Sequence, residues 1–380
     1  MNPKTVVPAL FGALVLATTA VQAQDEEKIL NIYNWSDYIA EDTIRNFEKE
    51  TGIKVRYDNF DNNEIVHAKL VAGKTGYDLI VPSSNWAKLQ LDGGLLRKLD
   101  KPLLPNLKYL DPAVQAQLAR MDPGNDYMAN WLWGYTTVGI NVDKVKAALG
   151  STPMPDNAWD LIFKPEYISK LKSCGVSFLD SATEVVPAAL HYLGKPPFSK
   201  NPGDYAAASQ LLKQVRPHIT LFSSSGYIND MAGGSVCVAL GWSGDINIAR
   251  QRAIDGKTGN NIQALIPKTG GLLFFDVMVI PVDAPRPGNA HKFINYIMRP
   301  DVHAGLTNKV FYANPNTEGS LVQFKSRYEH YIGGQWVAPI KGEYFENITP
   351  VTGKGFCEVG RGTAEDIEAA LDAAEAAAGP

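Results

Sequence analysis

The sequence predicts an α/β protein of two lobes joined by a hinge, and three observations support this. Short apolar strands alternate with amphipathic helices, this alternation stops and later restarts, and two extended segments lie where the chain would pass between lobes. A length of 380 residues with 45% hydrophobic residues is enough for two separate cores.

The first lobe is expected to begin with a parallel sheet. Apolar periodicity predicts, in chain order, a strand at 29–33, a helix at 41–51 that Gly52 ends, a strand at 53–57, a helix at 64–72 and a strand at 77–81. Strands and helices in this alternating order form a largely parallel sheet with helices on both faces.

The same alternation restarts in the second half of the chain. The expected elements are a strand at 174–179, helices at 184–192 and 205–215, a strand at 236–240 and a helix at 246–253. Residues 133–141 and 262–267 are extended and would cross between the lobes, which is typical of proteins that close around a ligand by hinge motion. The boundaries we expect are 24–133 and 262–306 for lobe one, and 134–261 and 307–316 for lobe two.

The N-terminus has the three parts of a secretory signal peptide. Lys4 is the only charge in residues 1–23, residues 6–20 are almost wholly apolar or small, and small residues around Ala23 suit signal peptidase. The alternative is a membrane anchor, but the apolar run is shorter than the roughly 20 residues that span a bilayer. We expect cleavage near Ala23 and export to the periplasm.

The charge and the cysteines set weaker limits. The net charge of -4 becomes more negative by one when the segment with Lys4 is removed, which disfavours nucleic acid and suits a cationic ligand. Cys174 and Cys237 occupy similar positions beside two expected strands, and either a disulfide or two buried thiols would fit. A disulfide closing so long a loop would add about 4 kcal/mol of stability. Cys357 is left over.

Aromatic and acidic residues recur where the expected strands meet neighbouring segments. Ligands of open parallel sheets bind at strand ends. The four junctions read NWSDY (34–38), PSSNW (82–86), GWSGD (241–245) and GLLFFD (271–276).

These junctions favour an alkylammonium ligand. A carboxylate accepts the N–H bonds of the ammonium, and an aromatic face adds a cation–π attraction of about 0.5–2 kcal/mol. A ligand charged at both ends needs a carboxylate at each end, because burying an unpaired charge is prohibitive. Trp35 with Asp37 and Trp242 with Asp245 could form such a pair across the cleft.

Structural roles are an alternative for each of these residues taken singly. Ser36 and Asp37, or Ser243 and Asp245, could be N-caps of the helices that follow them. Other residues have similar alternatives: Ser181 and Glu184 have the spacing of a capping box, and Phe274 could belong to the core. The recurrence of an aromatic residue and an acid in both halves is what favours a binding site.

Sequence signatures of an enzyme are absent. The six histidines include no pair three or four residues apart, so no helical metal site is indicated. The chain has no phosphate-binding loop, dinucleotide fingerprint or nucleophile elbow. We therefore expect a binding protein with no metal and no cofactor.

Several segments resemble the periplasmic putrescine/spermidine-binding proteins of ABC transporters. They are NWSDY (34–38), FEKETGIKV (47–55), YDLIVPS (77–83), GYTTVGIN (134–141) and GWSGD (241–245), and the likeness covers about residues 28–316. The resemblance implies a monomer with the type II periplasmic-binding fold, a polyamine ligand (putrescine or spermidine) and an inner-membrane ABC permease as partner. Within that family, NWSDY is more similar to the putrescine-preferring branch than to the spermidine receptors, which have Trp-Thr-Glu-Tyr at this place. Position by position, the resemblance implies ligand contacts at Trp35, Ser36, Asp37, Tyr38, Ser83, Glu184, Trp242, Asp245, Phe274, Asp276 and Tyr312.

The tail at 317–380 departs from that family. FKSRYEHYIGGQW (324–336), FENITPVTGK (345–354) and TAEDIEAAL (363–371) resemble the start of an aldehyde dehydrogenase, but the chain stops before that family's cofactor loop and catalytic cysteine. An NAD-dependent aldehyde dehydrogenase fragment is thus an alternative reading that rests on the tail alone. A receptor for another small cation, such as an amino acid, is a third. It would need a basic residue for the carboxylate, and the four junctions offer none.

Overall fold

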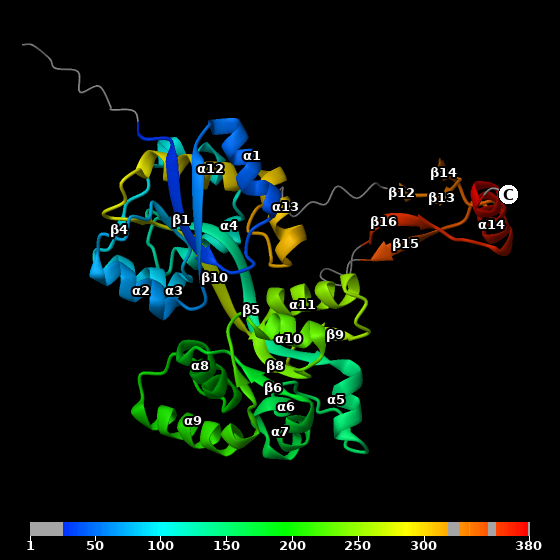
Figure 1. Cartoon of the computed structure of the whole chain (residues 1–380), viewed down its shortest axis with the longest axis horizontal. Helices are drawn as coiled ribbons and strands as arrows, with labels where there is room; N and C mark the ends of the chain where they lie inside the picture. The colour runs from blue at the N-terminus through cyan, green and yellow to red at the C-terminus, as the bar shows by residue number, and fades with distance from the viewer. Residues whose placement is uncertain (1–25, 318–326, 334, 349–354, 379–380) are drawn as a thin grey trace, which may run out of the picture.

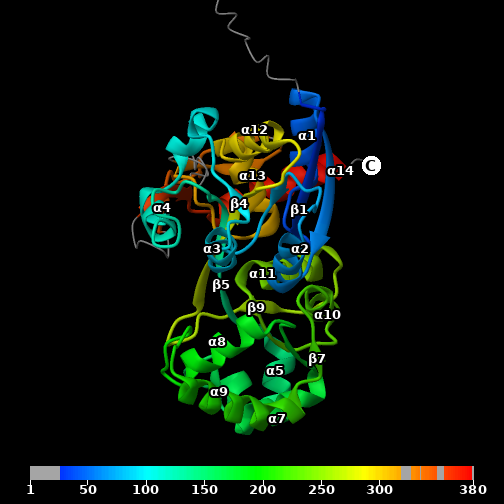
Figure 2. The ribbon, with the colours of Figure 1, turned by 90° about the vertical axis from the view of Figure 1, so that its left-hand side faces the viewer.

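The computed structural model describes residues 26–317, 327–333, 335–348 and 355–378. Two α/β lobes lie one above the other and are joined by long strands (Figures 1 and 2). The signal peptide expected at 1–23 lies outside the described residues. Within these ranges, no helix combines the length and the apolar character needed to cross a membrane.

Lobe one has a parallel sheet of order β2-β1-β3, as the sequence predicts. α1 ends at Gly52, whose φ of 70° is left-handed and suits glycine. The strands are β1 (Ile29–Trp35), β2 (Lys54–Phe60), β3 (Leu79–Ile80), β4 (Leu96–Arg97) and β11 (Ile280–Pro281). The helices are α1 (Glu41–Thr51), α2 (Asn63–Ala72), α3 (Ser84–Asp92), η1 (Lys101–Leu103), η2 (Pro105–Tyr109), α4 (Pro112–Leu118), α12 (Pro287–Ile297) and α13 (Pro300–Val310).

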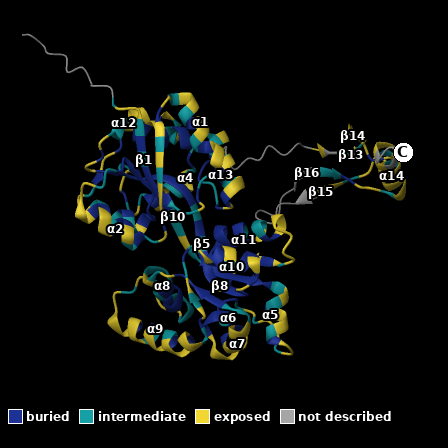
Figure 3. Ribbon diagram, in the orientation of Figure 1, coloured by how far each residue is buried: buried dark blue, intermediate teal, exposed yellow. Residues whose placement is uncertain are grey.

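Lobe two surrounds a six-stranded mixed sheet of order β10-β5-β8-β6-β7, in which β9 also pairs with β5. Its strands are β5 (Ala129–Asn141), β6 (Val176–Phe178), β7 (Leu221–Phe222), β8 (Val238–Trp242), β9 (Ile262–Ala264) and β10 (Leu272–Met278). Its helices are α5 (Val142–Leu149), α6 (Asp160–Phe163), α7 (Pro165–Leu171), η3 (Lys172–Cys174), α8 (Ala182–Tyr192), α9 (Pro202–Val215), η4 (Arg216–His218), α10 (Tyr227–Gly233) and α11 (Ser243–Asp255). Figure 3 shows the buried residues concentrated along the strands of both lobes.

The antiparallel strands β5 and β10 run through both lobes and form the hinge. The lobe-one end of β5 pairs with the end of β10, where Ala129 faces Met278. A third crossing comes from the segment after α13, where Ala313 bridges to Trp133. A closing motion would therefore bend the two strands and this segment together.

The lobe boundaries differ from the expected ones at two places. β9 pairs with Gly139–Asn141 at the lobe-two end of β5, so the chain returns to lobe one through β10 and not at residue 262. Residues 307–316, expected in lobe two, are anchored largely on lobe one: Pro315 accepts a backbone hydrogen bond from Asp111, and Asn316 bonds to Met298. Tyr312 alone in this segment reaches across to an acid of lobe two.

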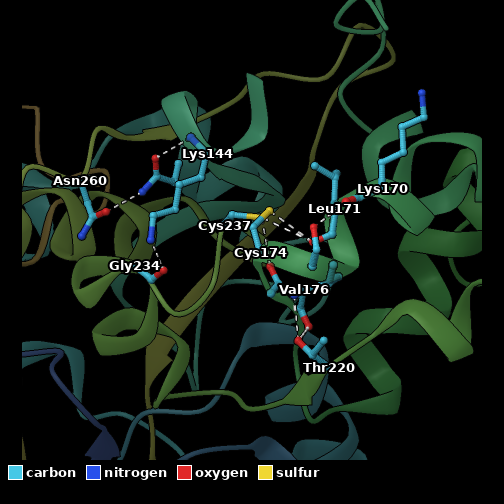
Figure 4. Close-up of a disulfide and its surroundings, with 12 residues drawn as sticks. Lys144, Lys170, Leu171, Cys174, Val176, Thr220, Gly234, Cys237 and Asn260 are labelled. Atoms are coloured by element: carbon cyan, nitrogen blue, oxygen red, sulfur yellow. Dashed lines mark hydrogen bonds between the residues drawn. A yellow bond between two sulfur atoms is a disulfide. The ribbon is translucent and has the colours of Figure 1, made fainter. Parts of the chain in front are cut away.

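A disulfide joins Cys174 and Cys237 in lobe two (Figure 4). Cys174 ends η3 and Cys237 lies directly before β8, with a Cα–Cα distance of 5.5 Å. The bridge ties the turn before β6 to the neighbouring strand. Cys357, which the sequence leaves over, lies in the tail strand β16.

The tail forms a small unit that lies to one side of the lobes in Figure 1. It contains a sheet of order β12-β16-β15, a hairpin β13-β14 and a C-terminal helix. Its elements are β12 (Arg327–Tyr328), β13 (His330–Ile332), β14 (Gln335–Val337), β15 (Tyr344–Ile348), β16 (Gly355–Gly360) and α14 (Ala364–Ala378).

Candidate functional site

A cavity lies between the two lobes, where the predicted strand-end junctions meet. Its empty volume is about 450 Å³, part of which opens to solvent. Most of the predicted contacts line it. The lining residues are Trp35, Ser36, Tyr38, Phe60, Asp61, Ser83, Ser224, Ser225, Ile228, Trp242, Asp245, Phe274, Asp276 and Tyr312.

Asp276 provides a buried carboxylate on the lobe-one side. It accepts hydrogen bonds from Tyr38 Oη at 2.8 Å and from Ser83 Oγ at 2.7 Å. Asn63 in turn donates to Ser83 Oγ and accepts from the Ser83 backbone N–H, which fixes the hydroxyl. Burial raises the pKa of Asp276 to about 6, although both hydroxyl donors oppose the shift.

Asp245 provides the matching carboxylate on the lobe-two side. It lies in the first turn of α11, where the helix dipole favours a negative charge. Tyr312 Oη donates to it at 2.6 Å and Tyr227 Oη at 3.1 Å. Burial raises the pKa of Asp245 to about 7. The cavity thus has an acid at each side, each held by two hydroxyl groups.

Aromatic rings from both lobes form the walls of the cavity. Trp35 and Trp242 meet edge to face across the lobes, with ring centroids 5.5 Å apart. Tyr38 and Tyr312 meet in the same way at 4.7 Å. Such rings can cover a methylene chain and attract a cation at its ends.

Glu184 lies beside the cavity and not on its surface. Its carboxylate accepts hydrogen bonds from Thr136 Oγ1 at 2.8 Å and from the Trp242 side chain, and burial raises its pKa to about 7. The capping box considered as an alternative is not formed, because the Ser181 side chain makes no cap bond in α8. Glu184 therefore orients one aromatic wall of the site.

Asp37, like Glu184, is a predicted contact that does not line the cavity. It forms an ion pair with Arg252 on α11, with 2.8 Å between Oδ1 and the guanidinium nitrogen, and its side chain is 42% exposed. Its φ of 54° turns the chain after β1, so that Ser36 and Tyr38 line the cavity while Asp37 does not. The ion pair joins lobe one to lobe two outside the cavity.

The helix-cap roles considered for the junctions are not found. α1 has Ala40 at its N-cap and α11 has Trp242, and neither helix has a side-chain cap bond. Ser36 instead donates to Asp61 at 3.1 Å. Ser36 and Asp245 are therefore available to the cavity.

Five lining residues were not predicted from the sequence. Phe60 is the last residue of β2 and Asp61 follows it, so the strand-end rule could have found them had the expected strand been extended by three residues. Ser224, Ser225 and Ile228 lie around the loop between β7 and α10. β7 has only two residues, too few for a periodic pattern, so the sequence carries no comparable signal there.

The acids of the site do not form a metal centre. Among the described residues, no group of three or more histidine, cysteine or acidic side chains could hold a metal ion. In the same ranges, no lysine or arginine lines the cavity. The arrangement can hold a small molecule that is positively charged at two ends.

The chain is similar to several known proteins. The family model described as "Bacterial extracellular solute-binding protein" matches residues 42–330. The putrescine-binding periplasmic protein PotF of Escherichia coli (strain K12) is 50% identical over 317 residues, covering 83% of this chain and 85% of that protein. The putrescine-binding periplasmic protein SpuD of Pseudomonas aeruginosa (strain UCBPP-PA14) is 49% identical, covering 80% and 85%.

A solved structure is also similar. The putative spermidine/putrescine ABC transporter protein from Listeria monocytogenes superposes with a TM-score of 0.68 at 33% identity, covering 77% of this chain and 85% of that one. The predicted two-lobed α/β fold is thereby confirmed.

Proposed function

Because the chain belongs to the bacterial extracellular solute-binding proteins, we propose that it is the polyamine receptor of an ABC uptake system and that its ligand is a diamine of putrescine's size. The family is one of solute-binding proteins and not of enzymes. The observation that carries the proposal is the pair of buried acids, Asp245 and Asp276, on opposite lobes of one aromatic cavity.

The chemistry of the cavity selects for a diammonium ligand. Each carboxylate can meet one ammonium and accept its N–H bonds, so neither ligand charge is buried unpaired. The rings of Trp35, Trp242 and Phe274 cover the apolar chain between the two charges. An amino acid would bring a carboxylate into a cavity whose described residues offer no cationic side chain.

Location and partners follow as further parts of the proposal. We propose export to the periplasm with cleavage near Ala23, because residues 1–23 have the form of a signal peptide. A monomer that delivers its ligand to an inner-membrane permease is the arrangement that this function requires.

Calorimetric titration of the purified chain tests the proposal. Putrescine should bind with heat release, spermidine should bind more weakly, and GABA, which carries a carboxylate, should not bind. If neither polyamine gives heat, the polyamine function is refuted. If GABA binds and putrescine does not, the ligand is an amino acid instead.

A further inference from the structure

Glu64 connects the two lobes outside the ligand cavity. It lies in the first turn of α2 in lobe one, yet its Oε1 accepts hydrogen bonds from Ser181 Oγ at 3.1 Å and from Thr183 Oγ1 at 3.0 Å. Both hydroxyls belong to the start of α8 in lobe two. Glu64 does not line the cavity, so its role differs from that of the acids described above.

The start of α8 is suited to receive a carboxylate from the other lobe. Ser181 is the N-cap residue, but its hydroxyl points to Glu64 and makes no cap bond within the helix. α8 has 11 residues, and the positive end of its dipole lies in the turn that faces Glu64. The contact can exist only when the lobes are together.

The same turn of α8 carries Glu184, which holds the Trp242 wall. Burial is the main reason that the pKa of Glu184 is raised, and Glu64 makes only the smallest contribution to the shift. The second oxygen of Glu64 is buried and has no hydrogen-bond partner among the described residues. Closing the lobes therefore buries a carboxylate oxygen of Glu64 that has no partner among the described residues, which opposes closure of the empty receptor.

We propose that Glu64 is an interlobe latch that holds α8 of lobe two against α2 of lobe one when the lobes are closed. The bonds to Ser181 and Thr183 stabilise the closed state, while burial of the second Glu64 oxygen disfavours closure of the empty receptor. Glu64 is thus a positioning residue and does not contact the ligand. The choice of putrescine as the ligand in the kinetic test rests on the proposed function; the ligand-free behaviour does not.

The latch is tested by stopped-flow binding of putrescine, followed by tryptophan fluorescence. Glu64→Ala should release putrescine about ten-fold faster, because two hydrogen bonds to a charged group are lost. Its association rate should stay within about two-fold, because encounter occurs with the open form. Thr183→Val should have a smaller effect that is not additive with Glu64→Ala. Asp92→Ala, which removes an exposed acid of the same lobe, is the matched control and should leave both rates unchanged.

Small-angle scattering of the ligand-free chain provides the second readout. Glu64→Gln keeps an oxygen acceptor but removes the charge, so the empty receptor should close more often and its radius of gyration should fall below that of Glu64→Ala. Equal radii for these two variants, or unchanged release from Glu64→Ala, would overturn the latch. A wild-type chain that binds no putrescine would refute the polyamine function, and the scattering comparison would still decide the latch.

Discussion

At the scale of single residues, the site is a set of acids whose surroundings differ. Asp245 and Asp276 are buried and each is held by two hydroxyl groups, whereas Asp37 is paired with Arg252 and nearly half exposed. A buried carboxylate facing an ammonium contributes far more to binding than an exposed ion pair does. The three aspartate carboxylates are chemically identical, yet we expect only the two buried ones to contribute strongly to ligand binding.

The first prediction separates these roles by substitution. Asp245→Asn should weaken putrescine binding about 100-fold or more, because one ligand ammonium would then be buried without its counter-charge. Asp37→Asn should cost less than about five-fold, since it removes only an exposed ion pair. Asp255→Asn, on the exposed side of α11, is the matched control. Calorimetry measures all three, and an Asp245→Asn affinity equal to that of wild type would remove this residue from the site.

The second prediction concerns pH. In the ligand-free protein, burial raises the pKa of Asp245 and Glu184 to about 7 and that of Asp276 to about 6, whereas unfolded carboxyls titrate near 4. Between about pH 4 and 7 the folded state therefore binds more protons than the unfolded state does. The free energy of unfolding that these three carboxyls contribute is consequently lost as the pH rises through this window. A diammonium ligand requires the ionised acids, so binding releases protons in the same window.

Putrescine affinity should accordingly rise from pH 5.5 to 8, by up to about ten-fold per unit for each proton released. Titrations in two buffers of different ionisation enthalpy would measure this release directly. An affinity independent of pH over this range would show that the acids are already ionised in the empty cavity.

At the scale of elements, much of the site could be predicted because it follows from strand ends. Parallel strands deliver their following residues to one edge of the sheet, and this rule placed the junctions with Trp35 and Trp242 at the cavity. Tyr38 and Ser83 lie in such junctions too, but only the family resemblance singled them out. It could not place Asp37, because a single residue with positive φ directs that side chain out of the cavity. The lobe boundaries were less predictable, because the single strand β5 extends through both lobes and pairs with β10 and β9.

The third prediction concerns the start of α11. A Cβ built on Gly244 would lie 2.1 Å from the Tyr312 ring, so no other residue fits there without moving that ring. Gly244→Ala should displace Tyr312 from Asp245 and weaken putrescine binding about ten-fold or more. Gly233→Ala is the matched control, because its Cβ would meet no atom within 4 Å. Wild-type affinity in Gly244→Ala, measured by calorimetry, would mean that the Tyr312 bond does not support binding.

At the scale of the whole molecule, the lobes and the tail differ in how they are built. The lobes share long strands and buried cores. In the tail, by contrast, the large apolar residues Tyr331, Trp336 and Ile367 are each more than half exposed. The family match ends at residue 330. The sequence resemblance of the tail to the start of an aldehyde dehydrogenase stays a prediction.

The last prediction follows from this division. A chain ending at Thr317 should bind putrescine within about two-fold of the full chain, because every cavity residue lies before that position. In the full chain, putrescine should raise the melting temperature of the lobes alone, because a ligand stabilises only the unit that binds it. A putrescine concentration of 100 times Kd adds about 2.7 kcal/mol to the free energy of unfolding of that unit. Scanning calorimetry should therefore show a weak, ligand-independent transition for the tail beside the shifted main transition. A single transition that putrescine shifts as a whole, together with lost binding in the shortened chain, would instead make the tail a structural part of the lobes.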